Sequence, residues 1–367
     1  MQGSLRNMLY KELQKFGQVK SNEPMAKHTT FKIGGPAEFF VTVEETNALI
    51  ALIQYLNEQG VAWFIVGGGS NMLAGDQGYK GVVIKLKTQN SKVTRLRSHE
   101  LRRGEETQTK NSKTELFAEA GCITVAIAQL SMQNRLTGFE WGVGVPGTIG
   151  GAVRGNAGAM GGEMKDSVAK VTVLRDGEII ELSNPDCKFS YRESIFKHNN
   201  DVILSVILQL RPAKNQNSMK QALEYLQYRN KTQPQGFAST GCIFKNYELK
   251  SQNSKVTRLR SHEVRRGEET ETQNLKLKSD LLLKFPNDTE KINHFFDIGK
   301  ISVGWLVEKA GMKGVQIGQA KVSETHGNFV VNLGSARAED VLMLVDAIKQ
   351  KVYTTCGIQI EEEIQIF

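Results

Sequence analysis

Glycine is concentrated in three segments of the chain, where the backbone could approach an anionic ligand closely. These segments are residues 33–37, residues 67–71 and the long run from Gly142 to Gly162. Backbone N–H groups in such turns bind phosphate, and a pyrophosphate is the ligand that this density of glycine favours. The literal G-x-G-x-x-G that starts at Gly142 is a weak dinucleotide fingerprint, because no apolar strand precedes it and Pro146 interrupts it. An ordinary structural turn is the alternative for each segment.

Two other chemistries lack their motifs in this sequence. There is no G-x-x-x-x-G-K-[ST] segment, and neither His99-Glu100 nor His262-Glu263 is followed by a second histidine at the zinc-protease spacing. The four cysteines are widely separated and form no C-x-x-C pair, so neither a zinc ribbon nor a disulfide framework is expected. We therefore predict no metal site.

The elements that must position the glycine segments follow mixed helical and strand patterns, which predicts an α+β fold. Apolar residues at helical spacing predict a helix over 45–59, and a buried strand over 61–66 leads directly into Gly67. Further along, we expect strands at 81–86 and 115–119, a helix at 124–135, and a hairpin of 168–174 with 178–182 around Asp176-Gly177.

A second domain is expected to begin after Arg211-Pro212, which gives domains of 1–212 and 213–367. Its first helix is predicted at 219–231, and a later amphipathic helix at 337–353 is followed by Gly357. A terminal strand is predicted over 358–367, because isoleucines alternate along it and share one face. Glu361 and Glu363 would point the other way, either to solvent or into a cleft.

Length and composition are those of an ordinary soluble protein. The 367 residues suggest two to three domains, at roughly 150 residues per domain, and 40% of the residues are hydrophobic. No apolar run approaches the roughly 18 residues that a spanning helix needs, and the first 20 residues mix Lys and Glu among apolar residues. We expect a cytoplasmic protein that is not attached to a membrane.

One segment of 21 residues occurs twice. Residues 89–109 and 252–272 differ only at Leu101/Val264 and Gln108/Glu271, while their surroundings are unrelated. We interpret them as in-frame insertions of about 88–112 and 250–276 that leave the host fold as surface loops. Arginine pairs in the copies could contact phosphates, but no aromatic residue accompanies them to stack bases, so no nucleic-acid partner is expected.

Six segments, in this order, resemble the UDP-N-acetylenolpyruvoylglucosamine reductase (MurB) family. They are HTTFKIGGPAEFFV (28–41), FIVGGGSNMLAGDQGYKGVVIKL (64–86), GFEWGVGVPGTIGGAVRGNAGAMGGEM (138–164), YRESIF (191–196), STGCIFKN (239–246) and IEEEI (360–364). The resemblance covers nearly the whole chain outside the two repeats. It implies an FAD-binding fold of the vanillyl-alcohol-oxidase (PCMH) type in two subdomains, followed by a C-terminal α+β substrate-binding domain.

The resemblance also implies an activity and its cofactors. It indicates an enzyme with bound FAD that uses NADPH to reduce the enolpyruvyl ether of UDP-N-acetylglucosamine to UDP-N-acetylmuramate, a peptidoglycan precursor. Carried over residue by residue, it places the cofactor against Ile33, Gly34, Gly35, Gly67, Gly68, Gly69, Ser70, Asn71, Pro146, Gly147, Thr148, Gly150 and Gly151.

The same resemblance implies three catalytic residues. Arg192 would contact the substrate carboxylate, Glu363 would act with it on the developing enolate, and Cys242 would deliver a proton. Much of the family has serine at the position of Cys242, but a thiol is the stronger acid, so activity is still expected. The alternatives are a surface arginine paired with Glu193 and a cysteine that only fills space.

Four further residues match positions that bind the UDP-sugar in the family. They are Tyr191, Lys231, Lys245 and Asn246. The residue after Asn246 is Tyr247, where the family usually has proline. Two other functions stay open from the sequence, namely a different flavin-dependent oxidation in the same fold and a nucleic-acid or partner-binding role of the repeats. We expect a monomer.

Overall fold

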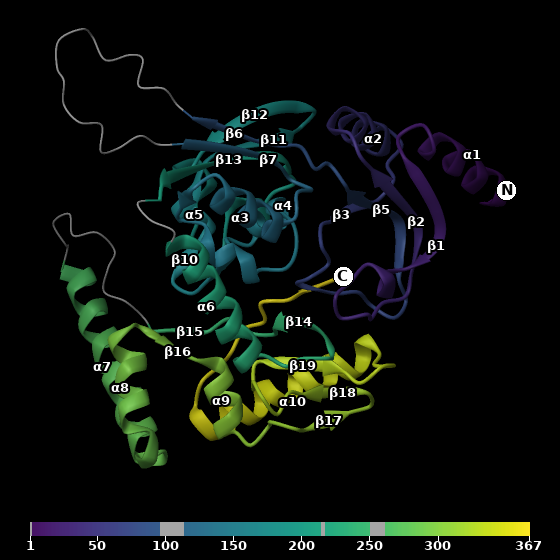
Figure 1. Cartoon of the computed structure of the whole chain (residues 1–367). Helices are drawn as coiled ribbons and strands as arrows, with labels where there is room; N and C mark the ends of the chain where they lie inside the picture. The colour runs from purple at the N-terminus through teal and green to yellow at the C-terminus, as the bar shows by residue number, and fades with distance from the viewer. Residues whose placement is uncertain (1, 96–113, 214–216, 250–260) are drawn as a thin grey trace, which may run out of the picture. The chain divides into compact units, whose positions relative to one another are not determined.

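The computed structural model describes residues 2–95, 114–213, 217–249 and 261–367. Its described residues form two compact units (Figure 1). Unit 1 consists of Met1–Gln235 together with Ile366–Phe367, and unit 2 consists of Gly236–Gln365. No helix among the described residues is long and apolar enough to cross a membrane.

The first sheet of unit 1 has four strands in the order β1-β2-β5-β3. Their bounds are β1 Gln18–Pro24, β2 Pro36–Val43, β5 Tyr79–Leu86 and β3 Trp63–Val66, and the flanking helices are α1 Gln2–Leu13 and α2 Thr46–Glu58. Strands β1 and β2 are antiparallel, whereas β2, β5 and β3 run parallel. Helix α2 buries Leu49, Leu52, Ile53 and Leu56, as its apolar spacing predicts.

The expected buried strand at 61–66 is wrong in one respect. The strand begins only at Trp63, and Val66 alone is fully buried while the other three residues are half-buried. The reason is its place in the sheet, because β3 is an edge strand and an edge strand has a neighbour on one side only.

The second sheet of unit 1 has the strand order β12-β11-β13-β7-β6, and β8 pairs with β13 beside this path. The bounds are β6 Ser91–Arg95, β7 Thr114–Glu119, β8 Leu136–Thr137, β11 Val168–Arg175, β12 Glu178–Ser183 and β13 Val202–Pro212. The predicted hairpin of β11 and β12 is confirmed, and its turn has Asp176 at φ 50° and Gly177 at φ 86°. Positive φ at both central residues is the twist-matching geometry of a two-residue hairpin.

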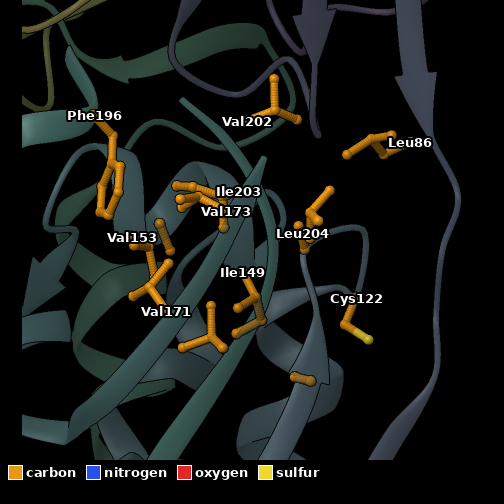
Figure 2. Close-up of a cluster of buried hydrophobic side chains, with 14 of the residues drawn as sticks. Leu86, Cys122, Ile149, Val153, Val171, Val173, Phe196, Val202, Ile203 and Leu204 are labelled. Atoms are coloured by element: carbon orange, nitrogen blue, oxygen red, sulfur yellow. The ribbon is translucent and has the colours of Figure 1, made fainter. Parts of the chain in front are cut away.

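Helices α3 and α4 pack with this sheet. They span Thr124–Gln133 and Ile149–Arg154, so the helix predicted at 124–135 is confirmed with an end two residues earlier. Figure 2 shows Ile149 and Val153 of α4 among buried side chains that include Val171, Val173 and Ile203. This core fixes α4, which lies within the third glycine segment.

The described part of the first repeat copy is not a loop. Residues 91–95 form β6, which pairs antiparallel with β7 and adds an edge to the second sheet. In the second copy, residues from Ser261 onward form the start of α7, which continues to Lys284. The rest of the two copies, residues 96–109 and 252–260, lies outside the described residues.

Unit 2 contains an antiparallel sheet in the order β14-β19-β18-β17. Its strands are β14 Ala238–Cys242, β17 Gln316–Ile317, β18 Ala320–Val322 and β19 Phe329–Asn332, and its helices are α7 Ser261–Lys284, α8 Thr289–Asp297, α9 Val303–Lys309 and α10 Ala338–Cys356. The predicted helix at 337–353 is confirmed as α10, which ends at Gly357 with φ 72° and buries an apolar face that includes Val341, Leu344 and Ile348.

The predicted terminal strand over 358–367 is wrong. Only Gln365–Ile366 is regular strand (β20), and residues 358–364 make a single bridge, between Glu362 and Phe244. Ile358, Ile360 and Ile364 are buried as expected, but Ile366 is 49% exposed. The alternation breaks because residues 366–367 pack in the other unit. Phe367 donates from N to Leu73 O (3.2 Å), and its carbonyl accepts from Gly75 N (2.8 Å).

The expected domain boundary at 212/213 differs from the division of the structure. Helix α6 (Asn217–Thr232), which confirms the helix predicted at 219–231, belongs to unit 1. It packs on the short 3-10 helix Glu140–Gly144, where Arg229 lies against Gly144. The remaining short elements are β4 Met72–Leu73, β9 Gly158–Ala159, β10 Gly162–Glu163, α5 Met164–Ser167, β15 Tyr247–Glu248 and β16 Lys300–Ile301.

Candidate active site

Two of the three glycine segments lie directly against each other in unit 1. A methyl group added at Gly68 would be 2.5 Å from Cα of Gly147, so only hydrogen at this position allows the two backbones to come so close. Ser70 Oγ donates a hydrogen bond to the Pro146 carbonyl (3.1 Å) and ties the same two loops together. The structure therefore brings residues 67–71 and 146–148 together, as the prediction of one cofactor site requires.

The first glycine segment is joined to the loop after β4. Gly35 N donates to the Gly75 carbonyl (2.9 Å), and the residue before the segment's glycines, Ile33, is buried and accepts from Thr29 Oγ1 (3.0 Å). Nearby, Thr30 N donates to the carbonyl of Gly69 (3.0 Å). All three glycine segments thus belong to one connected group of loops within unit 1.

The Gly67–Gly69 loop presents backbone donors that the protein does not use. Within the described part of the chain, the N–H groups of Gly67, Gly68 and Gly69 donate to no protein acceptor. Two of their carbonyls are held, because Gly67 O accepts from Lys85 Nζ and Gly69 O accepts from Thr30 N. Successive free N–H groups in a turn form an anion-binding concavity, which fits the diphosphate of a dinucleotide. These residues are able to hold FAD.

Gly150 and Gly151, by contrast, use their N–H groups inside the protein. Gly150 N donates to the Ala120 carbonyl (2.9 Å), and Gly151 N donates to Oγ1 of Thr148, which caps α4. These three residues shape the start of α4 and keep the neighbouring loop in place. Their contact with a cofactor stays a prediction.

Arg192 lies in a tight turn of unit 1 with an unusual backbone. Ser190 and Glu193 form an isolated antiparallel bridge, and Arg192 between them has φ 56°, a left-handed value that is uncommon for a residue with a side chain. Its guanidinium carbon is 5.8 Å from the ring centre of Tyr191, and its carbonyl accepts from Lys197 Nζ (2.6 Å). Such strained residues cluster at functional sites, where the surroundings fix the side chain.

The neighbouring Glu193 has polar partners of its own. Its carboxylate lies 3.0 Å from Nε2 of His198 and 3.5 Å from Nζ of Lys197. Arg192 itself is half-buried, and both its predicted role and the alternative of a surface arginine paired with Glu193 stay predictions. Lys231, a predicted substrate-binding residue of this unit, is exposed on α6.

In unit 2 the structure brings Cys242 and Glu363 together at the level of the backbone. Cys242 ends β14 and follows Gly241, whose φ is 80°. Glu363 N donates to the carbonyl of Ile243 (2.7 Å), the residue directly after Cys242. The predicted acid and the predicted glutamate are therefore on adjacent chain segments, although the regular terminal strand expected for Glu363 does not form.

Lys245 and Asn246 continue from this segment. Lys245 N donates to the Glu361 carbonyl (2.9 Å), and its Nζ lies 3.7 Å from the Glu361 carboxylate. Asn246 Oδ1 accepts from Val303 N (3.2 Å). Tyr247, which replaces the proline common in the family, pairs with Ile301 in the short β15–β16 ladder, so the backbone after Asn246 is held by strand pairing.

Cys242 differs from the other three cysteines. Cys122, Cys187 and Cys356 are buried, as expected for residues that only fill space, whereas Cys242 is half-buried. Burial raises the pKa of the Cys122 thiol to about 11 and that of Cys187 to about 12, and it also raises the pKa of Cys356. These three thiols stay protonated and unreactive at neutral pH.

Asn328 organises the Cys242 segment and was not among the predicted site residues. Its side chain donates from Nδ2 to the Phe244 carbonyl (2.8 Å) and accepts at Oδ1 from Phe244 N (2.9 Å), while its own carbonyl accepts from Ile243 N (2.9 Å). The only available signal was a polar residue immediately before the apolar run 329–331, and that signal is weak. Asn328 is buried, so these bonds replace those it would make to water.

Comparison with known proteins gives matches along most of the chain. Residues 37–183 match the model of an FAD binding domain, and residues 233–367 match the C-terminal domain of UDP-N-acetylenolpyruvoylglucosamine reductase. The UDP-N-acetylenolpyruvoylglucosamine reductase of Caldanaerobacter subterraneus is 34% identical over 357 residues, which is 97% of this chain and 96% of the relative.

The chain belongs to the UDP-N-acetylenolpyruvoylglucosamine reductase (MurB) family. The Bacillus subtilis reductase is likewise 34% identical, over 95% of this chain and 94% of its own length. The crystal structure of MurB from Thermus caldophilus has a TM-score of 0.65 and 26% sequence identity, and the match covers 95% of this chain and 98% of that one.

Membership of the MurB family confirms the predicted fold class. The chain is α+β, with an FAD-binding domain and a C-terminal domain of the MurB family. It is an FAD-dependent oxidoreductase, and FAD is its bound cofactor. The unused N–H groups of Gly67–Gly69 agree with this cofactor independently of the sequence match.

Proposed function

We propose that this protein catalyses the NADPH-dependent reduction of UDP-N-acetylglucosamine enolpyruvate to UDP-N-acetylmuramate, in the synthesis of peptidoglycan precursors. The observation that carries the proposal is the 34% identity to a reductase of this name across 97% of the chain. The glycine loops of unit 1 supply a fitting diphosphate site, and unit 2 supplies the paired segments of Cys242 and Glu363.

FAD held by the glycine loops of unit 1 would supply two-electron hydride chemistry between NADPH and the vinyl ether of the substrate. The residues of the chain have the remaining tasks of binding the substrate and managing charge and protons. Negative charge develops on the substrate after hydride addition and spreads into its carboxylate. A positioned cation or hydrogen-bond donor stabilises such charge by a few kcal/mol.

Arg192 is the proposed cation at this carboxylate. Its planar guanidinium can form two parallel hydrogen bonds to a carboxylate, and its constrained turn limits the entropy lost when it does so. Glu363 is proposed to act with it on the enolate, as a protonated or hydrogen-bonded carboxyl. Cys242 is proposed to deliver the proton to the carbon adjacent to the one that receives the hydride.

The proposed substrate-binding residues have simpler roles. Lys231 on exposed helix α6 offers an ammonium group to the diphosphate of the UDP-sugar, and Tyr191 accompanies Arg192. Lys245 and Asn246 follow Cys242 on the same segment and are proposed to orient the substrate. A cytoplasmic enzyme that works as a monomer, and the origin of the two repeats as insertions, are proposed on the sequence alone.

An anaerobic absorption experiment tests the proposal. NADPH is added to the purified protein first, and UDP-N-acetylglucosamine enolpyruvate second. We expect the flavin absorbance to bleach with NADPH and to recover with the substrate. Absence of bound flavin, reduced flavin that the substrate fails to reoxidise, or oxidised flavin that simple alcohols or hydroxy acids bleach as well as NADPH does, would contradict it.

A further inference from the structure

Lys85 is a half-buried cation with a single hydrogen-bond partner in the described chain. It lies on β5 in register with Val66, the residue directly before the glycine loop, and its Nζ donates to the carbonyl of Gly67. No carboxylate pairs with it among the described residues. Burial lowers the pKa of this lysine, and the nearby charge of Lys87 lowers it further. A buried ammonium without an acidic partner costs free energy, so a role for its charge is expected.

The contact with Gly67 fixes the direction of one of the unused donors. The peptide between Gly67 and Gly68 is trans, so the carbonyl of Gly67 and the N–H of Gly68 point to opposite sides of one planar peptide. When Lys85 holds this carbonyl, the Gly68 N–H is aimed away from the lysine and cannot rotate inward. The close contact between Gly68 and Gly147 restricts the same peptide from the other side.

We propose that Lys85 is a positioning residue for the FAD diphosphate, because it holds the Gly67 carbonyl so that the N–H of Gly68 faces the anion. The proposal rests on FAD binding as stated under the proposed function. The ammonium acts through the peptide, since a hydrogen bond to the carbonyl polarises the amide and strengthens the bond its N–H makes. The negative charge of the diphosphate in turn offsets the cost of burying the lysine.

The expected effect of Lys85 on FAD affinity follows from the distance between its ammonium group and the diphosphate. Two hydrogen bonds and the peptide between them separate the ammonium from the anion by roughly 8 Å. At an effective dielectric constant of about 20, the Coulomb attraction across this distance corresponds to a change of roughly tenfold to thirtyfold in a dissociation constant.

A structural role for Lys85 makes a different prediction from a positioning role. If the lysine only stabilised the fold, its loss would lower the melting temperature of the flavin-free protein. If it serves the anion, the flavin-free protein holds a half-buried charge whose only partner among the described residues is the neutral Gly67 carbonyl, so its loss leaves the melting temperature unchanged or raises it. The two roles thus predict different changes in the melting temperature of the flavin-free protein when Lys85 is replaced.

Three variants of the full-length protein separate these roles. Lys85→Met keeps most of the side-chain volume and removes the charge and the donor, whereas Lys85→Arg keeps both. Lys87→Met makes the same charge change two residues away, at an exposed position whose backbone N donates to Val43 O (2.8 Å). Each variant is stripped of flavin, its melting temperature is measured, and FAD is titrated back by the quenching of flavin fluorescence.

We expect Lys85→Met to weaken FAD binding by about tenfold or more, with a flavin-free melting temperature at or above that of the unmodified protein. Lys85→Arg should restore affinity to within about threefold, and Lys87→Met should change it by less than about twofold. Unchanged affinity in Lys85→Met, an equal loss in Lys87→Met, or a lowered flavin-free melting temperature would each overturn the proposal. A failure of the unmodified protein to bind FAD would instead refute the proposed function, and that result is obtained before any variant is compared.

Discussion

Gly69 and Gly60 provide a matched pair for measuring how tightly the glycine loop is packed. Both have φ 62°, so alanine at either position meets the same left-handed backbone. A methyl group at Gly60 would have no atom within 4 Å, whereas one at Gly69 would lie 2.0 Å from the carbonyl oxygen of His28. The comparison of Gly69→Ala with Gly60→Ala therefore removes the backbone cost and leaves the cost of the close approach.

The loss of folding free energy in each variant follows from this local geometry. Alanine in the left-handed region costs about 1–2 kcal/mol, and its smaller unfolded-state entropy returns about 0.4–1 kcal/mol, so Gly60→Ala should destabilise by about 1 kcal/mol. At Gly69 the His28 carbonyl must move by about 1 Å, and this overpacking adds about 1–3 kcal/mol. The same movement weakens the bond from Thr30 N to Gly69 O, worth about 1 kcal/mol. The difference between the variants should thus be about 2–4 kcal/mol.

Thermal unfolding of the flavin-free variants measures this difference. At about 2–4 °C per kcal/mol for a unit of this size, Gly69→Ala should melt roughly 5–15 °C below Gly60→Ala. Gly69→Ala should also lose FAD affinity, because the loop that carries the free N–H groups is displaced. Equal melting temperatures in the two variants would refute the argument, since they would mean that the loop accepts a side chain without moving the 28–30 segment.

Three further predictions concern the reaction and its pH dependence. Arg192→Lys should slow the reoxidation of reduced flavin by the substrate about tenfold to a hundredfold in stopped-flow measurements, and it should leave bleaching by NADPH unchanged. Equal slowing of both steps would contradict the role of Arg192 at the substrate carboxylate. Cys242→Ala should reduce turnover about 10²–10⁴-fold, whereas Cys242→Ser should stay active and resist inactivation by iodoacetamide, and an active alanine variant would exclude the thiol as the acid. Burial lowers the pKa of His326 below 6.5, so the unfolded chain binds a proton at this histidine more readily than the folded chain. The neutral form of His326 therefore contributes to folding stability fully above pH 6.5, and this contribution is lost as the pH falls below that value. The urea midpoint should accordingly fall less between pH 7.5 and 5.5 in His326→Asn than in the unmodified protein, and identical pH profiles would refute this assignment.

The sequence predicted those elements whose pattern is local. Helices α2, α6 and α10 were predicted to within a few residues, because their apolar spacing and the glycine after α10 are properties of short windows. The strand at 63–66 was expected to be fully buried, and the error arose because position in the sheet is not a local property. The alternation of isoleucines likewise suggested a terminal strand, although Ile366 ends up in the other unit and half exposed.

The candidate site likewise has features that the sequence predicted and features that it could not predict. The glycine density at 67–71 predicted an anion-binding loop, because glycine is needed wherever backbones approach closely. What the sequence could not show is which distant residue touches each glycine. The His28 carbonyl at Gly69, the Lys85 ammonium at Gly67 and the Asn328 amide at Phe244 are contacts between segments that are 18 to 84 residues apart. Such contacts depend on the tertiary structure.

The return of residues 366–367 to unit 1 has a consequence for the order of events during synthesis. The ring of Phe367 lies 4.5 Å from that of Phe64 and packs against a buried cluster that includes Met25, Phe40 and Val83. A ribosome makes all of unit 2 between these residues and Phe367, so the cluster lacks one of its rings until the second unit has emerged. Unit 1 therefore cannot finish folding before unit 2 has been translated, and a chaperone or a protease would meet it in an incomplete form for the whole of that interval.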